Sequence, residues 1–247
     1  MSELNMTIQS GVTRVLHTAG KYCEGDIVIK AEGGDYDKGY ESGVADGKKA
    51  EYDTFWDMFQ ENGNRTDYRY AFAYTKWKDG TFNPKYPLKF VGDATCAFLS
   101  TEFVWADKVL HVDLSEATYL YWTFRNNKFT HLGKCDLSSA TNITGIYSLC
   151  FNLKSIEEIV SHEGLPWHDA FTYDARLEDI TFSGVIGKSI SLANSSKLTT
   201  ASVQSIIDHL KDLTGQTAQT LTFHADVKGK LTDAQKAAIT AKNWQLG

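Results

Sequence analysis

An internal repeat constrains the fold of this chain more than any other feature. Residues 113–118 read DLSEAT and residues 136–141 read DLSSAT, so five of six positions are identical at a separation of 23 residues. Short apolar ladders recur around this pair and start at Val109, Phe129, Leu153 and Leu177. Self-similarity at a short fixed period is typical of repeat proteins, in which each unit buries its apolar face only against its neighbours. We therefore expect stacked repeats over residues 93–197.

The length of the repeat indicates what one unit contains. Successive ladders start 20, 24 and 24 residues apart. This period is too short for paired-helix repeats or propeller blades and falls within the leucine-rich range of about 20–29 residues. An apolar residue precedes each of the last three ladders, at Phe124, Leu149 and Phe171. One unit is therefore expected to be a short strand, a turn and an irregular return.

These patterns predict an α/β fold class. The expected architecture is an irregular leucine-rich-repeat-like solenoid with parallel short strands, preceded by a small β module and a helix and closed by an α/β C-terminal cap. Both ends of such a stack need a cap, because the outermost apolar ladders have a neighbour on one side only.

Residues 198–247 carry the pattern expected of the C-terminal cap. A helical face lies between Thr199 and Gly215, and its apolar residues are Val203, Ile206, Ile207, Leu210 and Leu213. Alternation over 220–223 predicts a strand. Thr232 and Gln235 match a capping box that opens a helix from Asp233 to about Lys242, and 244–246 predicts a last strand.

Two segments at the start of the chain have different compositions. Residues 1–34 contain a β-branched run at 26–30 and predict a β module for attachment. Residues 35–62 predict a spacer helix with one aromatic face, on which glycines four apart would let a second backbone approach. The residues expected to form an oligomer contact are Tyr36, Gly39, Tyr40, Gly43 and Gly47. A linker that is helical only from Lys48 onward is the open alternative.

Residues 63–92 connect these segments to the repeats and are rich in aromatic residues and turn signals. Two interpretations stay open. Exposed rings would form a surface that stacks on sugars or contacts a partner, whereas packed rings would form an N-terminal cap over the repeats.

Charge and composition exclude several classes. The 31 acidic and 25 basic residues give a net charge of −6, and no stripe of Lys and Arg could neutralise a phosphate backbone, so no nucleic-acid partner is expected. No apolar run approaches the roughly 20 residues of a membrane helix, so no membrane insertion is expected. The first residues show no secretory signal pattern, which predicts synthesis in a cytoplasm and no export by the general secretory route. The four cysteines, Cys23, Cys96, Cys135 and Cys150, are too scattered for a disulfide framework and are expected to be buried thiols.

The sequence shows no motif typical of a catalytic site. His162 and His168 are six residues apart across a Gly and a Pro, which does not match zinc-ligand spacing. His131 and Cys135 would lie about 13 Å apart on a strand, too far for a nucleophile and its base. We therefore expect no enzyme, no catalytic residue, no metal and no cofactor. A pair of carboxylates assembled from distant repeats, as in a glycan hydrolase, is the alternative that stays open.

Binding is the chemistry that stacked repeats supply readily, because they present extended surfaces. The aromatic residues least needed for the ladders are the expected contact residues, and they are Trp105, Tyr119, Tyr121, Trp122, Tyr147 and Trp167. For each of these residues, burial in the core is the alternative that stays open.

Several of these patterns resemble known families. The spacing of Phe171, Leu177 and Ile180 is similar to that of degenerate BspA-type leucine-rich repeats, although the Asn or Cys ladder residue of the full signature is absent. The stretches YDKGYESG, KAEYDTFW and NGNRT within 36–66, the C-terminal LTDAQKAAITAKNW and the N-terminal GKY followed by DIVI resemble tail-associated structural proteins of phages and prophages of gut Firmicutes.

This resemblance implies a biological setting. It implies a virion tail component, associated with a fibre or baseplate, that is made in the bacterial host cytoplasm. Its partners would be a bacterial cell-surface glycan or protein, other tail proteins through the N-terminal module, and further copies of itself, with a trimer as one candidate assembly. A bacterial surface or interaction module of non-phage origin is the alternative.

Overall fold

The computed structural model describes residues 4–7, 12–16, 27–31, 66–74, 76–77, 88–103 and 109–247. Within them the chain is mixed α/β, with mostly parallel strands and few helices, and the described strands form no closed barrel. The predictions for the spacer helix 35–62, and those for Trp105, lie outside the described residues.

The first described sheet is antiparallel and has the order β1-β2-β3. Its strands are β1 (Leu4–Thr7), β2 (Val12–Leu16) and β3 (Ile27–Ala31). Val12 pairs with Ala31, and Leu16 pairs with both Leu4 and Ile27. The predicted β unit is therefore present, and β1 is a strand that the sequence analysis did not predict.

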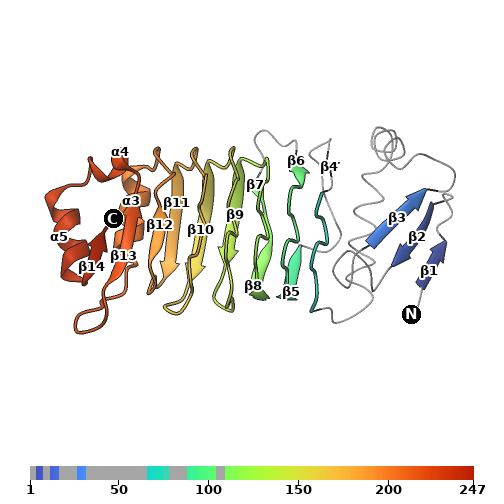
Figure 1. Ribbon diagram of the computed structural model, residues 1–247, viewed down its shortest axis with the longest axis horizontal. Coiled ribbons are helices and arrows are strands. Elements are labelled where there is room, and N and C mark those ends of the chain that lie inside the picture. The colour runs from blue at the N-terminus through green and yellow to red at the C-terminus, as the bar shows by residue number, and fades with distance from the viewer. Residues whose placement is uncertain are drawn as a thin grey trace.

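Parallel strands follow one another in chain order along the molecule (Figure 1). They are β4 (Lys76–Trp77), β5 (Lys89–Asp93), β6 (Glu102–Phe103), β7 (Val109–Leu110), β8 (Asp113–Tyr119), β9 (His131–Asp136), β10 (Ser155–Ser161) and β11 (Asp179–Gly184). Strand β4 pairs with β6, β5 with β8, and β7, β9, β10 and β11 form one four-stranded sheet.

The register shows why the apolar ladders recur. Leu132, Ile156 and Ile180 pair side by side across β9, β10 and β11, and all three are buried. We call the residues from the start of one of these strands to the start of the next a layer, so that 131–154 and 155–178 are two layers. Each layer thus places the same apolar position against the layer before it.

A second backbone ladder joins the layers on the side away from these strands. The N–H of Phe98 donates to the carbonyl of Thr123 at 2.8 Å, and the N–H of Phe124 donates to the carbonyl of Ile146 at 2.9 Å. Every segment in this ladder carries two residues in the left-handed region, four positions apart. The pairs are Tyr70 and Tyr74, Cys96 and Ser100, Trp122 and Asn126, Gly145 and Leu149, and Asp169 and Tyr173. The expected irregular return is therefore a run of turns with regularly spaced left-handed residues.

A column of stacked aromatic rings fills the core between the two ladders. Its members are Phe72, Phe98, Phe124, Tyr147 and Phe171. Their successive ring centroids are 5.1, 5.5, 6.0 and 5.3 Å apart, and all five rings are buried. The sequence pattern predicts Leu149 as the counterpart of Phe124 and Phe171, and this prediction is wrong. Tyr147 holds that place, because Leu149 is at a left-handed position (φ +62°) that directs it out of the column.

Buried polar side chains form a further column beside the aromatic one. The Thr101 hydroxyl donates to the carbonyl of Phe72 at 2.7 Å, the Asn127 amide donates to the carbonyl of Phe98, and the Cys150 thiol donates to the carbonyl of Phe124 at 3.0 Å. Each of these bonds ties a layer to the one before it. Asn127 and Cys150 thus each bond to a backbone carbonyl of the preceding layer, although the sequence lacks the full leucine-rich signature.

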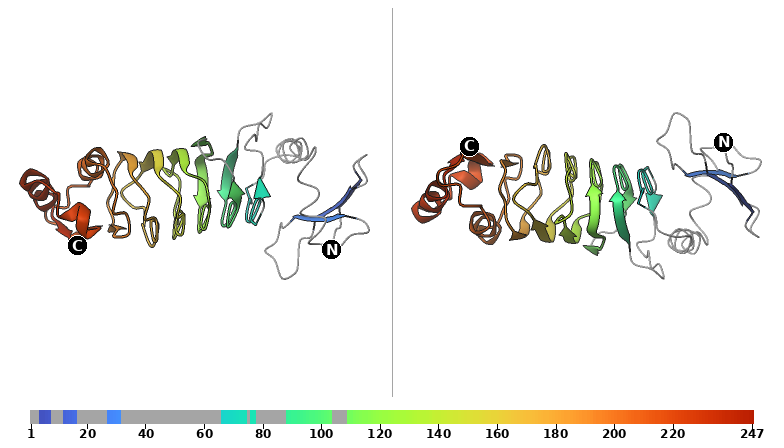
Figure 2. Two further views of the ribbon diagram at one scale, coloured as in Figure 1. Left: turned by 90° about the horizontal axis from the view of Figure 1, so that it is seen from above. Right: turned by 90° about the horizontal axis from the view of Figure 1, so that it is seen from below.

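The C-terminal region mixes helices with a parallel sheet of order β12-β13-β14, and its helices gather at that end of the molecule (Figure 2). Its elements are β12 (Ile190–Leu192), α3 (Thr200–Asp208), β13 (Gln219–Phe223), α4 (Ala225–Lys228), α5 (Asp233–Ala241) and β14 (Trp244–Leu246). Thr232 and Gln235 form the predicted capping box. Helix α3 ends earlier than predicted, so Leu210 and Leu213 are buried from the segment that follows it. Within the described residues, no helix has the length and apolar character needed to cross a membrane.

Candidate binding surface and cleft

Segment 119–125 places three aromatic rings and an arginine at the described surface. Trp122 stacks on Tyr121 with ring centroids 4.5 Å apart and an interplanar angle of 24°. The guanidinium carbon of Arg125 lies 3.9 Å from the centre of the Trp122 ring, within the range of a cation–π interaction. We call Tyr119, Tyr121, Trp122 and Arg125 the aromatic surface.

The backbone explains why these rings face outward. Leu120, Thr123 and Phe124 turn into the core, which leaves Tyr119 exposed and Tyr121 and Trp122 half-buried. Trp122 itself has a left-handed φ of +55°. Its indole lies over Gly145 of the next layer, where an added Cβ would come within 2.7 Å of Trp122 Cδ1. The absence of a side chain at residue 145 therefore makes room for the indole.

Two of the expected contact residues are core residues instead. Tyr147 is fully buried between Phe124 and Phe171 in the aromatic column. Trp167 is 3% exposed, stacks on Phe171 and meets Phe182 edge-on at 5.5 Å. A surface role for Tyr147 and Trp167 is therefore corrected. Burial of these large rings stabilises the stack, since it removes apolar area from water.

The aromatic connection 63–92 is described in part. Tyr68 and Phe72 are buried against Phe90 and Phe98, so these two rings are packed and not exposed. Tyr74 is exposed at the left-handed position that Tyr173 occupies four layers later.

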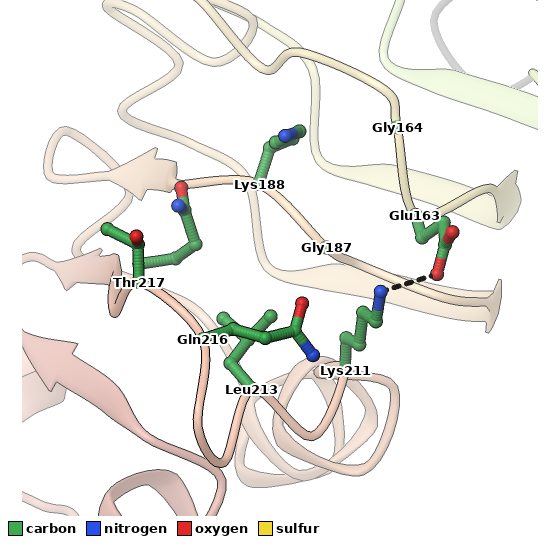
Figure 3. Close-up of a pocket in the computed structure, with 9 residues that line it drawn as sticks. Glu163, Gly164, Gly187, Lys188, Lys211, Leu213, Gln216 and Thr217 are labelled. Atoms are coloured by element: carbon green, nitrogen blue, oxygen red, sulfur yellow. Dashed lines mark ion pairs between the residues drawn. The ribbon is translucent and has the colours of Figure 1, made fainter.

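A polar cleft of about 470 Å³ lies near the C-terminal end of the stack (Figure 3). Three chain segments line it: the loop after β10, the link between β11 and β12, and the link from α3 to the first residue of β13. Its lining residues are Glu163, Gly164, Gly187, Lys188, Lys211, Leu213, Gln216, Thr217 and Gln219. The Lys211 ammonium and the Glu163 carboxylate form an ion pair of 2.7 Å across it. The sequence analysis did not predict this cleft, because its residues come from positions 163 to 219 and carry no local motif.

The histidines and cysteines considered for chemistry have structural contacts. His162 Nε2 lies 2.8 Å from the carbonyl oxygen of Ala140 in the preceding layer, and His131 Nδ1 lies 2.7 Å from the Ser155 hydroxyl. Cys135 and Cys150 are buried free thiols, as expected. Burial raises the pKa of Cys135 to about 12 despite an opposing hydrogen bond with Tyr147, so this thiol stays protonated at neutral pH.

Glu158 on β10 is held by neighbours in the two adjacent strands. Glu158 forms an ion pair of 3.1 Å with Lys134 and accepts a hydrogen bond of 2.6 Å from the Ser183 hydroxyl. Hydrogen bonds from Ser183 and Lys134 hold the pKa of Glu158 below its usual value. Among the residues that the structure describes, no three His, Cys, Asp or Glu side chains are placed to hold a metal ion.

Comparisons with known proteins add no assignment, since no family model, no curated protein and no solved structure matches the chain. The geometry of the aromatic surface and of the cleft is therefore the basis for a functional proposal.

Proposed function

We propose that this chain is a non-enzymatic binding protein whose repeat region is an irregular leucine-rich-repeat-like solenoid, and that the aromatic surface binds a receptor on a bacterial cell. The solenoid is supported by the parallel register of β9, β10 and β11 and by the five pairs of left-handed residues that recur every 23 to 26 positions. Such stacks present extended surfaces on which a partner can lie.

The observation that carries the binding proposal is the packing of Trp122 between layers. Its contacts with Tyr121, Arg125 and Gly145 hold the indole in one position before any ligand arrives. Aromatic residues and arginine dominate the energetics of protein interfaces, and preorganised side chains lose little entropy on binding. Tyr119 adds an exposed ring from the same segment. A surface glycan or protein that covers these rings is the proposed partner.

The biological setting is proposed from the resemblance to phage tail proteins. The chain would be part of a phage or prophage tail, with residues 1–34 attaching it to other tail proteins and the repeats facing the host. Mass spectrometry of purified, induced particles tests this, and the chain should be found in the virion fraction. Recovery on bacterial cells without particles would favour the bacterial surface module instead.

Substitution in the aromatic surface tests the binding role. We expect Trp122→Ala and Arg125→Ala each to weaken binding of the purified protein to host cells or to a glycan array by at least about tenfold, the size of an interface hot spot. Phe151→Ala is the matched control, because Phe151 is 52% exposed and lies outside the aromatic surface. Equal binding by the wild type and the Trp122→Ala protein would rule out this surface as the receptor site.

A further inference from the structure

The cleft beyond β10 is built from segments that the backbone holds in place. The N–H of Ile186 donates to the carbonyl of His209, and the N–H of Lys211 donates back to the carbonyl of Ile186, at 2.8 and 2.9 Å. Gly187 packs directly on the backbone of Glu163, where an added Cβ would lie 2.2 Å from the carbonyl oxygen. The walls that carry Glu163, Lys188 and Lys211 are therefore fixed relative to one another.

The remaining wall is hydrogen-bonded to the residues that follow α5, at the start of β14. The side-chain amide of Asn243 donates to the carbonyls of Leu213 and Gln216 at 3.1 and 2.9 Å. The carbonyl of Lys211 accepts a hydrogen bond of 2.9 Å from the indole N–H of Trp244. These bonds preform the loop that presents Gln216 and Thr217 to the cleft.

The side chains in the cleft are suited to a polar ligand. Figure 3 shows Glu163 and Thr217 at opposite ends of the view, with Lys188, Gln216 and Lys211 between them. Leu213 is the only apolar side chain among the lining residues, and it is buried. The volume of about 470 Å³ lies in the range of small-molecule sites, about 300–1,000 Å³, but the lining offers hydrogen-bond partners in place of an apolar contact surface.

The charges in the cleft favour an anion. Lys211 is neutralised by its ion pair with Glu163, whose pKa the hydrogen-bonded Lys211 ammonium holds below its usual value. Lys188 is exposed, and in the described part of the chain no carboxylate lies within ion-pair distance of it. One positive charge is therefore left over. The amide of Gln216, the hydroxyl of Thr217 and the carboxylate of Glu163 are the groups that hydroxyls of a ligand would contact.

We infer that this cleft is a second binding site, for an anionic polyhydroxylated ligand whose negative group pairs with Lys188 and whose hydroxyls bond to Glu163, Gln216 and Thr217. A carboxylate of a sugar acid and a phosphate of a polyol phosphate share this chemistry. This ligand, like the partner in the proposed function, would come from a cell surface. The cleft contains no residue of the aromatic surface.

Isothermal titration calorimetry of the full chain with three probes tests the site. The probes are D-glucuronate, glycerol phosphate and D-glucose. We expect saturable binding of at least one of the two anionic probes, and the tighter of the two identifies the source of the charge. Binding should weaken as salt is added, because the pairing with Lys188 is exposed to screening. No binding of either anionic probe, or equal binding of D-glucose, would overturn the inference.

Two substitutions make the test specific. Lys188→Ala should weaken anion binding at least tenfold, whereas Lys154→Ala should leave it unchanged, because Lys154 is an exposed lysine that precedes β10 while Glu163 follows that strand. Both side chains are exposed, so both variants should unfold at the wild-type temperature. An unchanged affinity in Lys188→Ala would contradict the inference. Trp122→Ala should keep wild-type affinity for the probe, so failure of the aromatic surface as a receptor site would be seen separately.

Discussion

The Oδ1 atom of Asp174 accepts a hydrogen bond of 3.1 Å from the backbone N–H of Cys150, one layer earlier, while its Oδ2 atom is buried without a hydrogen-bond partner in the described structure. The side chain is fully buried, and none of the described ion pairs includes it. Burial raises the pKa of Asp174 well above its usual value, against the opposing effect of the Cys150 N–H. The core therefore favours the protonated form of this carboxyl group.

This carboxyl group should make stability fall as pH rises. Above a pH of about 3.9 the unfolded chain loses the Asp174 proton while the folded chain keeps it, so the folded state binds more protons. Relative to Asp174→Asn, the wild type should lose up to about 1.4 kcal/mol of unfolding free energy per pH unit until the folded pKa is reached. Urea unfolding of both proteins between pH 4 and 8 measures this difference.

Asp212→Asn is the control with the opposite sign, and its unfolding is measured between about pH 2 and 5, where a carboxyl group with a lowered pKa titrates. Hydrogen bonds from the hydroxyl and N–H of Thr214 hold the pKa of Asp212 below its usual value. Asp212 therefore stabilises the fold above its unfolded pKa, and this contribution is lost as pH falls through the folded pKa. A wild-type curve parallel to that of Asp174→Asn over the whole range would contradict the account of Asp174.

The aromatic column should carry a large share of the stability. Phe124 lies between Phe98 and Tyr147 and is fully buried. Phe124→Ala should lower the free energy of unfolding by about 3–5 kcal/mol, since it removes transfer energy and leaves a cavity. Phe151→Ala, at an exposed ring, should cost less than about 0.5 kcal/mol. Similar losses in the two variants, measured by chemical denaturation, would show that the column is not continuous.

The adjacent residues Asn126 and Asn127 test how much the buried polar column contributes to the free energy of unfolding. Asn127 is buried and its amide bonds to the carbonyl of Phe98, whereas Asn126 is exposed and its amide bonds to the Ser100 hydroxyl at 3.0 Å. Asn127→Ala removes this bond, and the Phe98 carbonyl keeps only its hydrogen bond of 3.1 Å from the N–H of Thr101, so the loss should be about 0.5–1.5 kcal/mol. Asn126→Ala should cost much less, because water replaces its partner. Thermal unfolding of the pair checks the ranking, and a reversed order would contradict it.

A comparison of Gly145→Ala with Gly215→Ala distinguishes the cost of backbone strain from the cost of a steric clash with Trp122. Both have positive φ values, +60° and +76°, but an added Cβ at 215 would meet no atom within 4 Å. Each Gly→Ala change should cost about 1–2 kcal/mol for the left-handed backbone. Gly145→Ala should also displace the indole, which near-ultraviolet circular dichroism reports. If the aromatic signal stayed unchanged in Gly145→Ala, Trp122 would not rest on this glycine.

Much of the stacking followed from local patterns. The apolar ladders at Leu132, Ile156 and Ile180 align as their spacing predicts, because a parallel register repeats the same buried position in every layer. The capping box of Thr232 and Gln235 was also legible, since a cap depends on residues three apart. The capping box is decided within one turn of helix, and the ladders were predictable because their spacing recurs along the chain.

The choice between Tyr147 and Leu149 was decided only by the tertiary structure. Both are apolar residues in one short segment, and their inward or outward direction depends on which residues adopt left-handed backbone. That choice is set by hydrogen bonds to segments 22 to 25 residues away, such as those from the N–H groups of Tyr147 to Ala170 and of Leu149 to Thr172. The same long-range bonds place Trp122 over Gly145 and bring Glu163, Lys188 and Lys211 to one cleft. The sequence alone determined that layers repeat, and the contacts between layers decided which side chains each layer buries.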